Sequence, residues 1–299
     1  MTVVELFDSS PTIFIITATI LGLMVGSFLN VVIYRYPIML FREWGNMAKE
    51  ILTEQGYSVT GAPKDSKLLD AHFNIVTPRS RCPKCNHLIR SWENIPVVSY
   101  LIQGARCSQC KTYISIRYPF VEILTGATFG WLAYQFGFSW ETLSFFIFSS
   151  LLISLIFIDI DQKILPDPIN YILLWLGLLS AYLGLTLPLA ESLLGALAGY
   201  LSLWSFYWLF KLATKKEGMG YGDFKLLAAI GAFVGINKLL LVVILSAGVG
   251  AIVGITLMLL KKTDRSSQIP FGPYLAVAGW ITLFWGDTII DFYLRSSGL

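Results

Sequence analysis

Long apolar segments recur along this chain and leave few folds open to it. A run of about 20 apolar residues is the length that crosses the hydrocarbon core of a membrane as a helix. Only 14% of the residues are charged, against about 25% in soluble domains. The sequence therefore predicts an all-α polytopic membrane protein with about eight transmembrane helices. The expected spans are residues 12–34, 119–136, 141–158, 168–187, 190–210, 224–235, 238–260 and 271–294.

The sixth of these segments, residues 224–235, is short for a membrane span. It contains two glycines, Gly231 and Gly235. Because small residues let helix backbones approach each other in a membrane, we expect this segment to pack closely against its neighbours.

The basic residues predict an orientation in the membrane. Twelve of the 22 Lys and Arg residues lie between the first two spans, in residues 35–118. The loops after the third, fifth and seventh spans also contain basic residues, whereas loops 137–140, 186–189 and 236–237 contain none. Positive charge accumulates on the cytoplasmic side. We therefore expect residues 35–118 in the cytoplasm and both termini on the opposite side of the membrane.

Four cysteines lie close together in this expected cytoplasmic segment. They form two C-x2-C pairs separated by 21 residues, and two such turns can supply four thiolates to one tetrahedral ion. A reducing cytoplasm argues against disulfides, so the pattern favours a structural zinc site. A redox dithiol pair or unliganded thiols remain the alternatives. The expected metal ligands are Cys82, Cys85, Cys107 and Cys110.

Together these patterns divide the chain into three expected domains. Residues 1–34 form the first transmembrane helix, 35–118 a zinc-binding domain, and 119–299 a seven-helix membrane domain. The chain has neither an H-E-x-x-H nor a G-x-S-x-G motif, which argues against a zinc metalloprotease and a serine hydrolase of the common type.

Two acidic patches interrupt the apolar segments. Asp159 and Asp161 follow the third span and precede Pro166, and Asp223 closes the glycine-rich stretch 218–223 before the sixth span. Ionisable groups in membrane segments are costly and usually functional. The expected topology places both patches on the cytoplasmic face, so they can be neighbours. Glycines beside Asp223 would allow a substrate backbone to approach closely; they are Gly220 and Gly222.

A pair of aspartates can hydrolyse a peptide by sharing one water molecule. One carboxylate is ionised and takes a proton from the water, while the other is protonated and donates to the substrate carbonyl. The residues alone do not decide between Asp159 and Asp161 as the partner of Asp223. Two other classes of function stay open: an ion-coupled transporter, which would hold acids near the midplane, and a membrane-anchored zinc scaffold or nucleic-acid adaptor. A net charge of +3 is too small to favour nucleic acid.

Several short stretches resemble the bacterial type IV prepilin peptidases, the bifunctional leader peptidase/N-methyltransferases. The resemblance covers essentially the full chain, and the stretches occur in the order found in that family. The aspartate patches complete the series, with Asp223 in a G-x-G-D motif and Asp159 seven residues before the proline of a Leu-Pro pair. The earlier stretches are residues 26–35 (GSFLNVVIYR), 78–85 (PRSRCPKC), 91–96 (SWENIP), 104–110 (GARCSQC) and 117–122 (RYPFVE).

The resemblance implies a function and roles for individual residues. It implies Asp159 and Asp223 as the catalytic pair, cutting on the cytoplasmic side after a glycine. Because the family is bacterial, it also implies the inner membrane, with both termini in the periplasm. The expected substrates are type IV prepilins or type II secretion pseudopilins, embedded in membrane lipid. It also implies N-methylation of the new N-terminus with S-adenosylmethionine, for which Glu43 is a suggested residue. Supporting roles near the aspartates fall to Asp161, Pro166, Gly220, Gly222 and Lys225.

Overall fold

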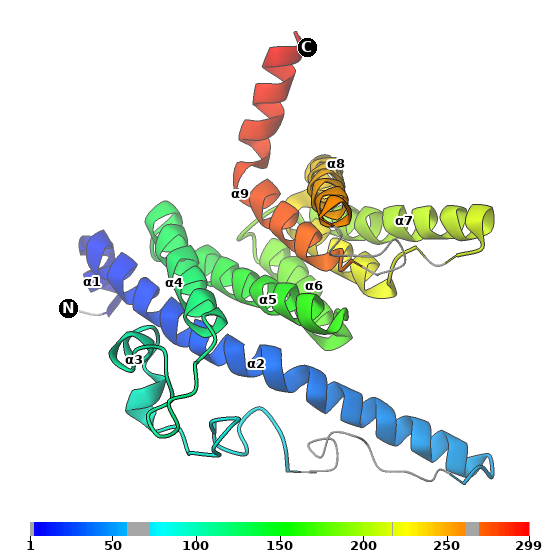
Figure 1. Ribbon diagram of the computed structural model, residues 1–299. Coiled ribbons are helices and arrows are strands. Elements are labelled where there is room, and N and C mark those ends of the chain that lie inside the picture. Colours follow the sequence, from blue (N-terminus) through cyan, green and yellow to red (C-terminus); the bar gives the residue numbers. More distant parts are fainter. Residues whose placement is uncertain (1–2, 59–71, 217, 261–268, 299) are drawn as a thin grey trace. The chain divides into compact units, whose positions relative to one another are not determined.

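The computed structural model describes residues 3–58, 72–216, 218–260 and 269–298 (Figure 1). Within these ranges the regular structure is helical, and strand-like pairing is confined to two isolated antiparallel bridges. The chain divides into two compact units, residues 1–135 and 136–299. The helices are α1 (Val3–Ser9), α2 (Pro11–Glu54), the 3-10 helix η2 (Ser91–Asn94), α3 (Val98–Ile102), α4 (Arg117–Phe136), α5 (Trp140–Gln162), α6 (Asp167–Tyr182), α7 (Leu189–Thr214), α8 (Tyr221–Leu259) and α9 (Gly272–Ser297).

In the first unit, α2 is much longer than a membrane span. Its 44 residues correspond to about 66 Å at 1.5 Å per residue, whereas the hydrocarbon core is about 30 Å thick. The first expected span, residues 12–34, lies within this helix, which continues to Glu54. The helix continues because residues 46–54 (NMAKEILTE) are rich in strong helix formers, and this extension is exposed along its length. The expected domain boundary after residue 34 therefore falls inside a helix.

Small residues bring α2 and α4 together within the same unit. A methyl group added at Gly26 would lie 2.7 Å from the Cα of Glu122, and one added at Gly22 would lie 2.8 Å from the Cβ of Phe129. The side-chain amide of Asn30 donates to the main-chain oxygen of Tyr118 at 3.1 Å. Close approach of backbones through glycine is the usual packing mode of membrane helices.

The first half of α8 forms the core of the second unit. Nearly all residues between Asp223 and Gly235 are buried, and α6, α7 and α9 surround this stretch. Glycines make the contacts close, as the sequence led us to expect for this segment. Gly195 of α7 lies against the backbone of Gly231, and Gly279 of α9 against the side chain of Ile230.

The expected sixth and seventh spans form one element, α8, interrupted at Gly235. This residue has φ 74° and ψ 171°, a backbone conformation that glycine adopts at little cost. Five helices of the described chain are long and apolar enough to cross a membrane, namely α2, α5, α7, α8 and α9. The chain is thus a multi-pass membrane protein, while the count of eight spans is not confirmed. Five basic residues used to predict the orientation lie outside the described residues: Lys64, Lys67, Lys261, Lys262 and Arg265.

Candidate functional site

Asp159 lies in the last turn of α5. α5 runs to Gln162, beyond residue 158, where the expected third span ends. Lys163 follows in the left-handed conformation, and its N–H donates to the Asp159 main-chain oxygen at 2.9 Å. Only 5% of Asp159 is exposed, whereas Asp161 is an exposed residue. Residues two apart project from different sides of a helix, which explains why only one of this pair is buried.

Asp223 lies in the first turn of α8. The helix begins at Tyr221 after the cap residue Gly220, and the Asp223 N–H donates to the Gly220 oxygen at 3.3 Å. Asp223 is 7% exposed. Both aspartates are therefore part of helix ends rather than of the connecting loops in which we expected them.

The structure brings these two buried carboxylates together. Asp159 lies beside Gly272 and Asp223 directly follows Gly222, and both glycines pack against the side chain of Leu165. Leu165, in the connection between α5 and α6, lies against the turn that carries Asp223, because a methyl group added at Gly222 would be 2.8 Å from the Leu165 Cβ. The expectation that the two acidic patches are neighbours is confirmed, and Asp159 rather than Asp161 is the buried member of the first patch.

The remaining residues expected to support the aspartates take different positions. Pro166 is buried and caps the start of α6. The Lys225 ammonium is 2.5 Å from a carboxylate oxygen of Asp167 and 5.7 Å from the centre of the Tyr171 ring. Lys225 thus links α8 to α6, and this ion pair was not expected.

Sequence reasoning missed one contact of Asp159. The main-chain N–H of Gly272, at the start of α9, donates to the Asp159 Oδ2 at 3.0 Å, and this bond is buried. Glycine followed by Pro273 marks a helix start in the sequence. Nothing in one sequence indicates that this helix start meets a carboxylate 113 residues away.

The four cysteines converge at one point in the first unit. Their sulfurs all lie within 4.8 Å of one another, with 3.8 Å between Cys82 and Cys110 and 3.9 Å between Cys85 and Cys107. Four sulfurs placed tetrahedrally at about 2.3 Å from a zinc ion would be about 3.8 Å apart. No disulfide joins these cysteines, so the geometry fits a four-thiolate metal site.

The two halves of this site have the same local structure. The N–H of Cys82 donates to the His87 oxygen at 2.9 Å, and the N–H of Cys107 donates to the Thr112 oxygen at 2.8 Å. An antiparallel bridge flanks each turn, Arg81 with Leu88 and Arg106 with Tyr113. Each turn also contains one residue with φ 58°, Asn86 in the first and Lys111 in the second. The fold therefore forms two equivalent cysteine turns (knuckles) that could together bind a single ion.

Glu93 connects the two knuckles, a role that its sequence position did not reveal. Its carboxylate accepts from the Arg90 N–H at 2.7 Å and lies 3.3 Å from the His87 Nε2. The Arg90 N–H and then the Ser108 hydroxyl lower the pKa of the Glu93 carboxyl. Because His87 follows the first knuckle and Ser108 belongs to the second, Glu93 ties the two halves of the metal site together.

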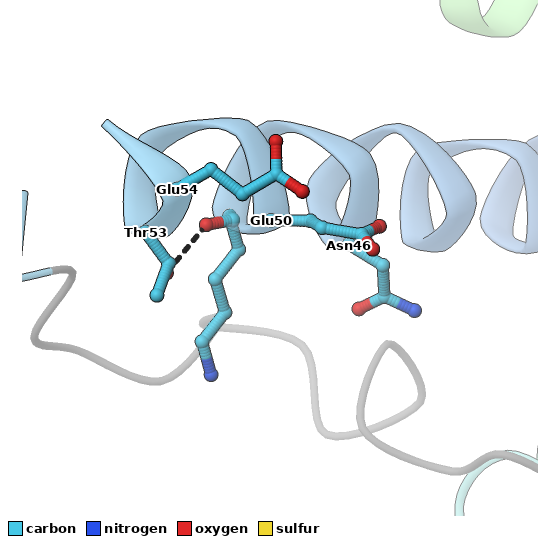
Figure 2. A pocket seen from close by; sticks show the side chains of 5 residues that line it. Asn46, Glu50, Thr53 and Glu54 are labelled. Atoms are coloured by element: carbon cyan, nitrogen blue, oxygen red, sulfur yellow. Dashed lines mark hydrogen bonds between the residues drawn. The ribbon is translucent and has the colours of Figure 1, made fainter. Parts of the chain in front are cut away.

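Glu43 is an exposed residue of α2 in the first unit. Further along this helix, a shallow hollow is lined by exposed side chains (Figure 2), and no expected site residue takes part in it. Nothing in the described residues connects Glu43 with a methyl donor, so its role stays a prediction. The hollow is lined by Asn46, Lys49, Glu50, Thr53 and Glu54.

Comparisons with known proteins agree with this division of the chain. Residues 20–136 match the bacterial Peptidase A24 N-terminal domain, and residues 146–255 match the type IV leader peptidase family. The comparison with solved structures found no match.

Several proteins with the name prepilin leader peptidase/N-methyltransferase are similar to the chain over its whole length. The protein from Stutzerimonas stutzeri is 48% identical over 299 residues, which is 100% of both chains. The protein from Pseudomonas aeruginosa is 47% identical over 298 residues, 100% of this chain and 99% of the relative. The protein from Aeromonas salmonicida is 49% identical over 292 residues, 98% of each. These similarities do not support a transporter, and the chain belongs to the type IV leader peptidase family.

Proposed function

We propose that this chain is a membrane aspartic endopeptidase that removes the leader of type IV prepilins and then N-methylates the new N-terminus. The observation that supports the peptidase best is the pair of buried carboxylates, Asp159 and Asp223. They lie at two helix ends that meet at the side chain of Leu165. The names of the full-length relatives, which join a leader peptidase with an N-methyltransferase, support the two activities.

The proposed hydrolysis uses the two aspartates with one shared proton. Two neighbouring buried carboxyl groups repel each other when both are charged, which favours a state in which one is ionised and the other protonated. The ionised group takes a proton from water, the resulting hydroxide adds to the peptide carbonyl, and the protonated group donates to the carbonyl oxygen. When the C–N bond breaks, the first aspartate passes the proton that it took from water to the leaving amine, and a hydroxyl of the intermediate returns a proton to the second aspartate. Water has then been added across the bond, and the pair again shares one proton.

The position of the site suits a substrate with a basic leader and an apolar helix. Both aspartates lie at ends of apolar helices, α5 and α8, which we place at the cytoplasmic surface because the basic loops indicate that side. The substrate helix would stay in lipid while its leader reaches the interface. Gly220 leaves room beside Asp223 for the substrate backbone, because a methyl group added there would meet no atom nearer than 3.6 Å. Pseudopilins of type II secretion share this pattern and belong to the same proposed substrate class.

The four cysteines would hold a zinc ion that stabilises the fold of the first unit. Their spacing fits a closed tetrahedral site, which leaves no open position for catalysis. S-adenosylmethionine supplies the methyl group when bound, and we propose that the first unit provides its site. The division into domains 1–34, 35–118 and 119–299 stays a proposal, as do the inner membrane and the periplasmic termini.

Cleavage and methylation of a synthetic prepilin in detergent test this function. Mass spectrometry would distinguish the shortened product from its methylated form. We expect Asp159→Asn and Asp223→Asn each to abolish cutting, while Asp161→Asn, which alters an exposed residue, retains most of it. Each variant should still methylate a pilin supplied without its leader, which shows that the protein is folded. Wild-type cleavage rates in either buried variant would refute the assignment.

A further inference from the structure

We propose that the main-chain amide of Gly272 positions Asp159 for peptide cleavage, and that residue 272 has to be glycine because a side chain would displace that carboxylate. This inference rests on the proposed peptidase function. It assigns to the start of α9, which carries neither aspartate, a direct part in arranging the active site.

The hydrogen bonds at the start of α9 single out this amide. The first N–H groups of a helix have no partner within the helix. Pro273 has no N–H, and the Tyr274 N–H donates to the Phe271 oxygen at 3.1 Å. The Gly272 N–H instead leaves its own helix and donates to the Asp159 Oδ2 at 3.0 Å, in a buried environment. An anionic acceptor is also favoured there by the partial positive charge at the helix start.

The space around Gly272 is filled by the active site itself. A methyl group added at this residue would lie 2.6 Å from the Asp159 Oδ2 and 2.9 Å from the Leu165 Cδ2. Atoms this close must move apart, and the nearest one belongs to the catalytic carboxylate. The glycine is buried, and its requirement here is one of space rather than of backbone conformation.

Leu165 extends this arrangement to the second aspartate. The same leucine that packs on Gly272 also packs on Gly222, next to Asp223. The start of α9, the connection after α5 and the start of α8 therefore meet at one side chain, with a carboxylate on each side. The hydrogen bond from Gly272 to Oδ2 orients the carboxylate, and we assign contact with the reacting water to the other oxygen, the Asp159 Oδ1. A fixed main-chain donor holds this orientation without reorganising during the reaction.

The first experiment compares two glycine-to-alanine variants in the same helix. Gly272→Ala introduces a methyl group 2.6 Å from a carboxylate oxygen, and Gly279→Ala introduces one 2.6 Å from the Ile230 Cγ2, away from both aspartates. We expect Gly272→Ala to lower kcat for prepilin cleavage by about 100-fold with little change in KM, since small displacements of reacting groups have effects of this size. Gly279→Ala should keep kcat within a few-fold of the wild type, and the amount of folded protein is measured for both.

A second variant removes the donor without adding any atom that could collide. Replacing Gly272 by glycolic acid converts the amide N–H into an ester oxygen. We expect about a 10-fold or larger fall in kcat, again with KM unchanged, because a hydrogen bond to a charged group is lost. This variant keeps the test decisive even if Gly272→Ala does not fold.

The outcomes separate this inference from the function on which it rests. Wild type and Asp159→Asn are assayed beside the glycine variants. If wild type cuts and Asp159→Asn does not, the peptidase stands, and the position-272 variants decide the inference alone. Wild-type kcat in the ester variant, or equal losses in Gly272→Ala and Gly279→Ala, would overturn it. A wild type that fails to cut any prepilin would overturn both.

Discussion

Among single residues, an aliphatic side chain and the glycines that it contacts hold the two carboxylates in place, although none of them can take part in the reaction. Leu165 fills the space between Gly222 and Gly272, so the separation of the two segments depends on one aliphatic side chain. Protein interiors are close-packed, so adding even one methyl group displaces the neighbouring atoms. The catalytic geometry should therefore be sensitive to the glycines around Leu165 as well as to the aspartates.

Gly222→Ala tests this sensitivity beside Asp223. The added methyl group would lie 2.8 Å from the Leu165 Cβ, and the turn that carries Asp223 would have to shift. We expect kcat for prepilin cleavage to fall by about 10-fold to 100-fold. Gly218→Ala is the matched control, because its methyl group would lie 2.9 Å from the Phe210 ring, outside the carboxylate pair. Equal rates in the two variants would contradict the prediction.

At the scale of helices, α8 depends on small residues along α7. An added methyl group at Gly195 would collide with the main-chain oxygen of Gly231, and one at Gly199 would lie 2.6 Å from the oxygen of Leu227. Ser192 also donates from its hydroxyl to the Ala232 oxygen at 2.6 Å. Backbone atoms cannot move aside as a side chain can, so these positions should tolerate substitution poorly.

Alanine substitutions at Gly195 and Gly248 measure the cost of crowding this contact. We expect Gly195→Ala to destabilise the protein by about 1–3 kcal/mol, as overpacking commonly does. Gly248, in the exposed half of α8, has no atom within 4 Å of the added methyl group, and Gly248→Ala should raise stability by up to about 1 kcal/mol through helix propensity. Thermal unfolding in detergent compares the two. A lower midpoint for Gly248→Ala than for Gly195→Ala would contradict the packing argument.

The sequence predicted elements and local motifs better than contacts between distant segments. Apolar runs located the long helices because each run is a local property, although only five described helices are long and apolar enough to cross a membrane. The C-x2-C spacing predicted the cysteine cluster because it too is local. The end of α2 was missed because the helix continues through Arg35 and Pro37 into residues 42–54, many of which are polar. Gly272 and Glu93 were missed as structural partners because their roles depend on tertiary contacts, which one sequence does not contain.

At the scale of the whole molecule, the two compact units contain different candidate sites. The cysteine cluster and Glu93 belong to residues 1–135, whereas Asp159, Asp223 and Gly272 all belong to residues 136–299. The described part of the first unit beyond α2 has little regular structure before α4. A bound metal would therefore supply much of its folding free energy, while the second unit has a helical core of its own.

We therefore expect removal of zinc to unfold the cysteine-containing part of the first unit, while the second unit stays folded. Purified protein should contain one zinc per chain, and a chelator should make residues 79–111 susceptible to trypsin, which has sites there such as Arg81, Lys84 and Arg106. The fragment that carries Asp159 and Asp223 should stay intact, because its helices pack without the metal. Added zinc should restore protection in the wild type but not in Cys82→Ser. If chelation exposed both units to cleavage equally, the metal would stabilise the whole protein, and the independence of the peptidase unit would be refuted.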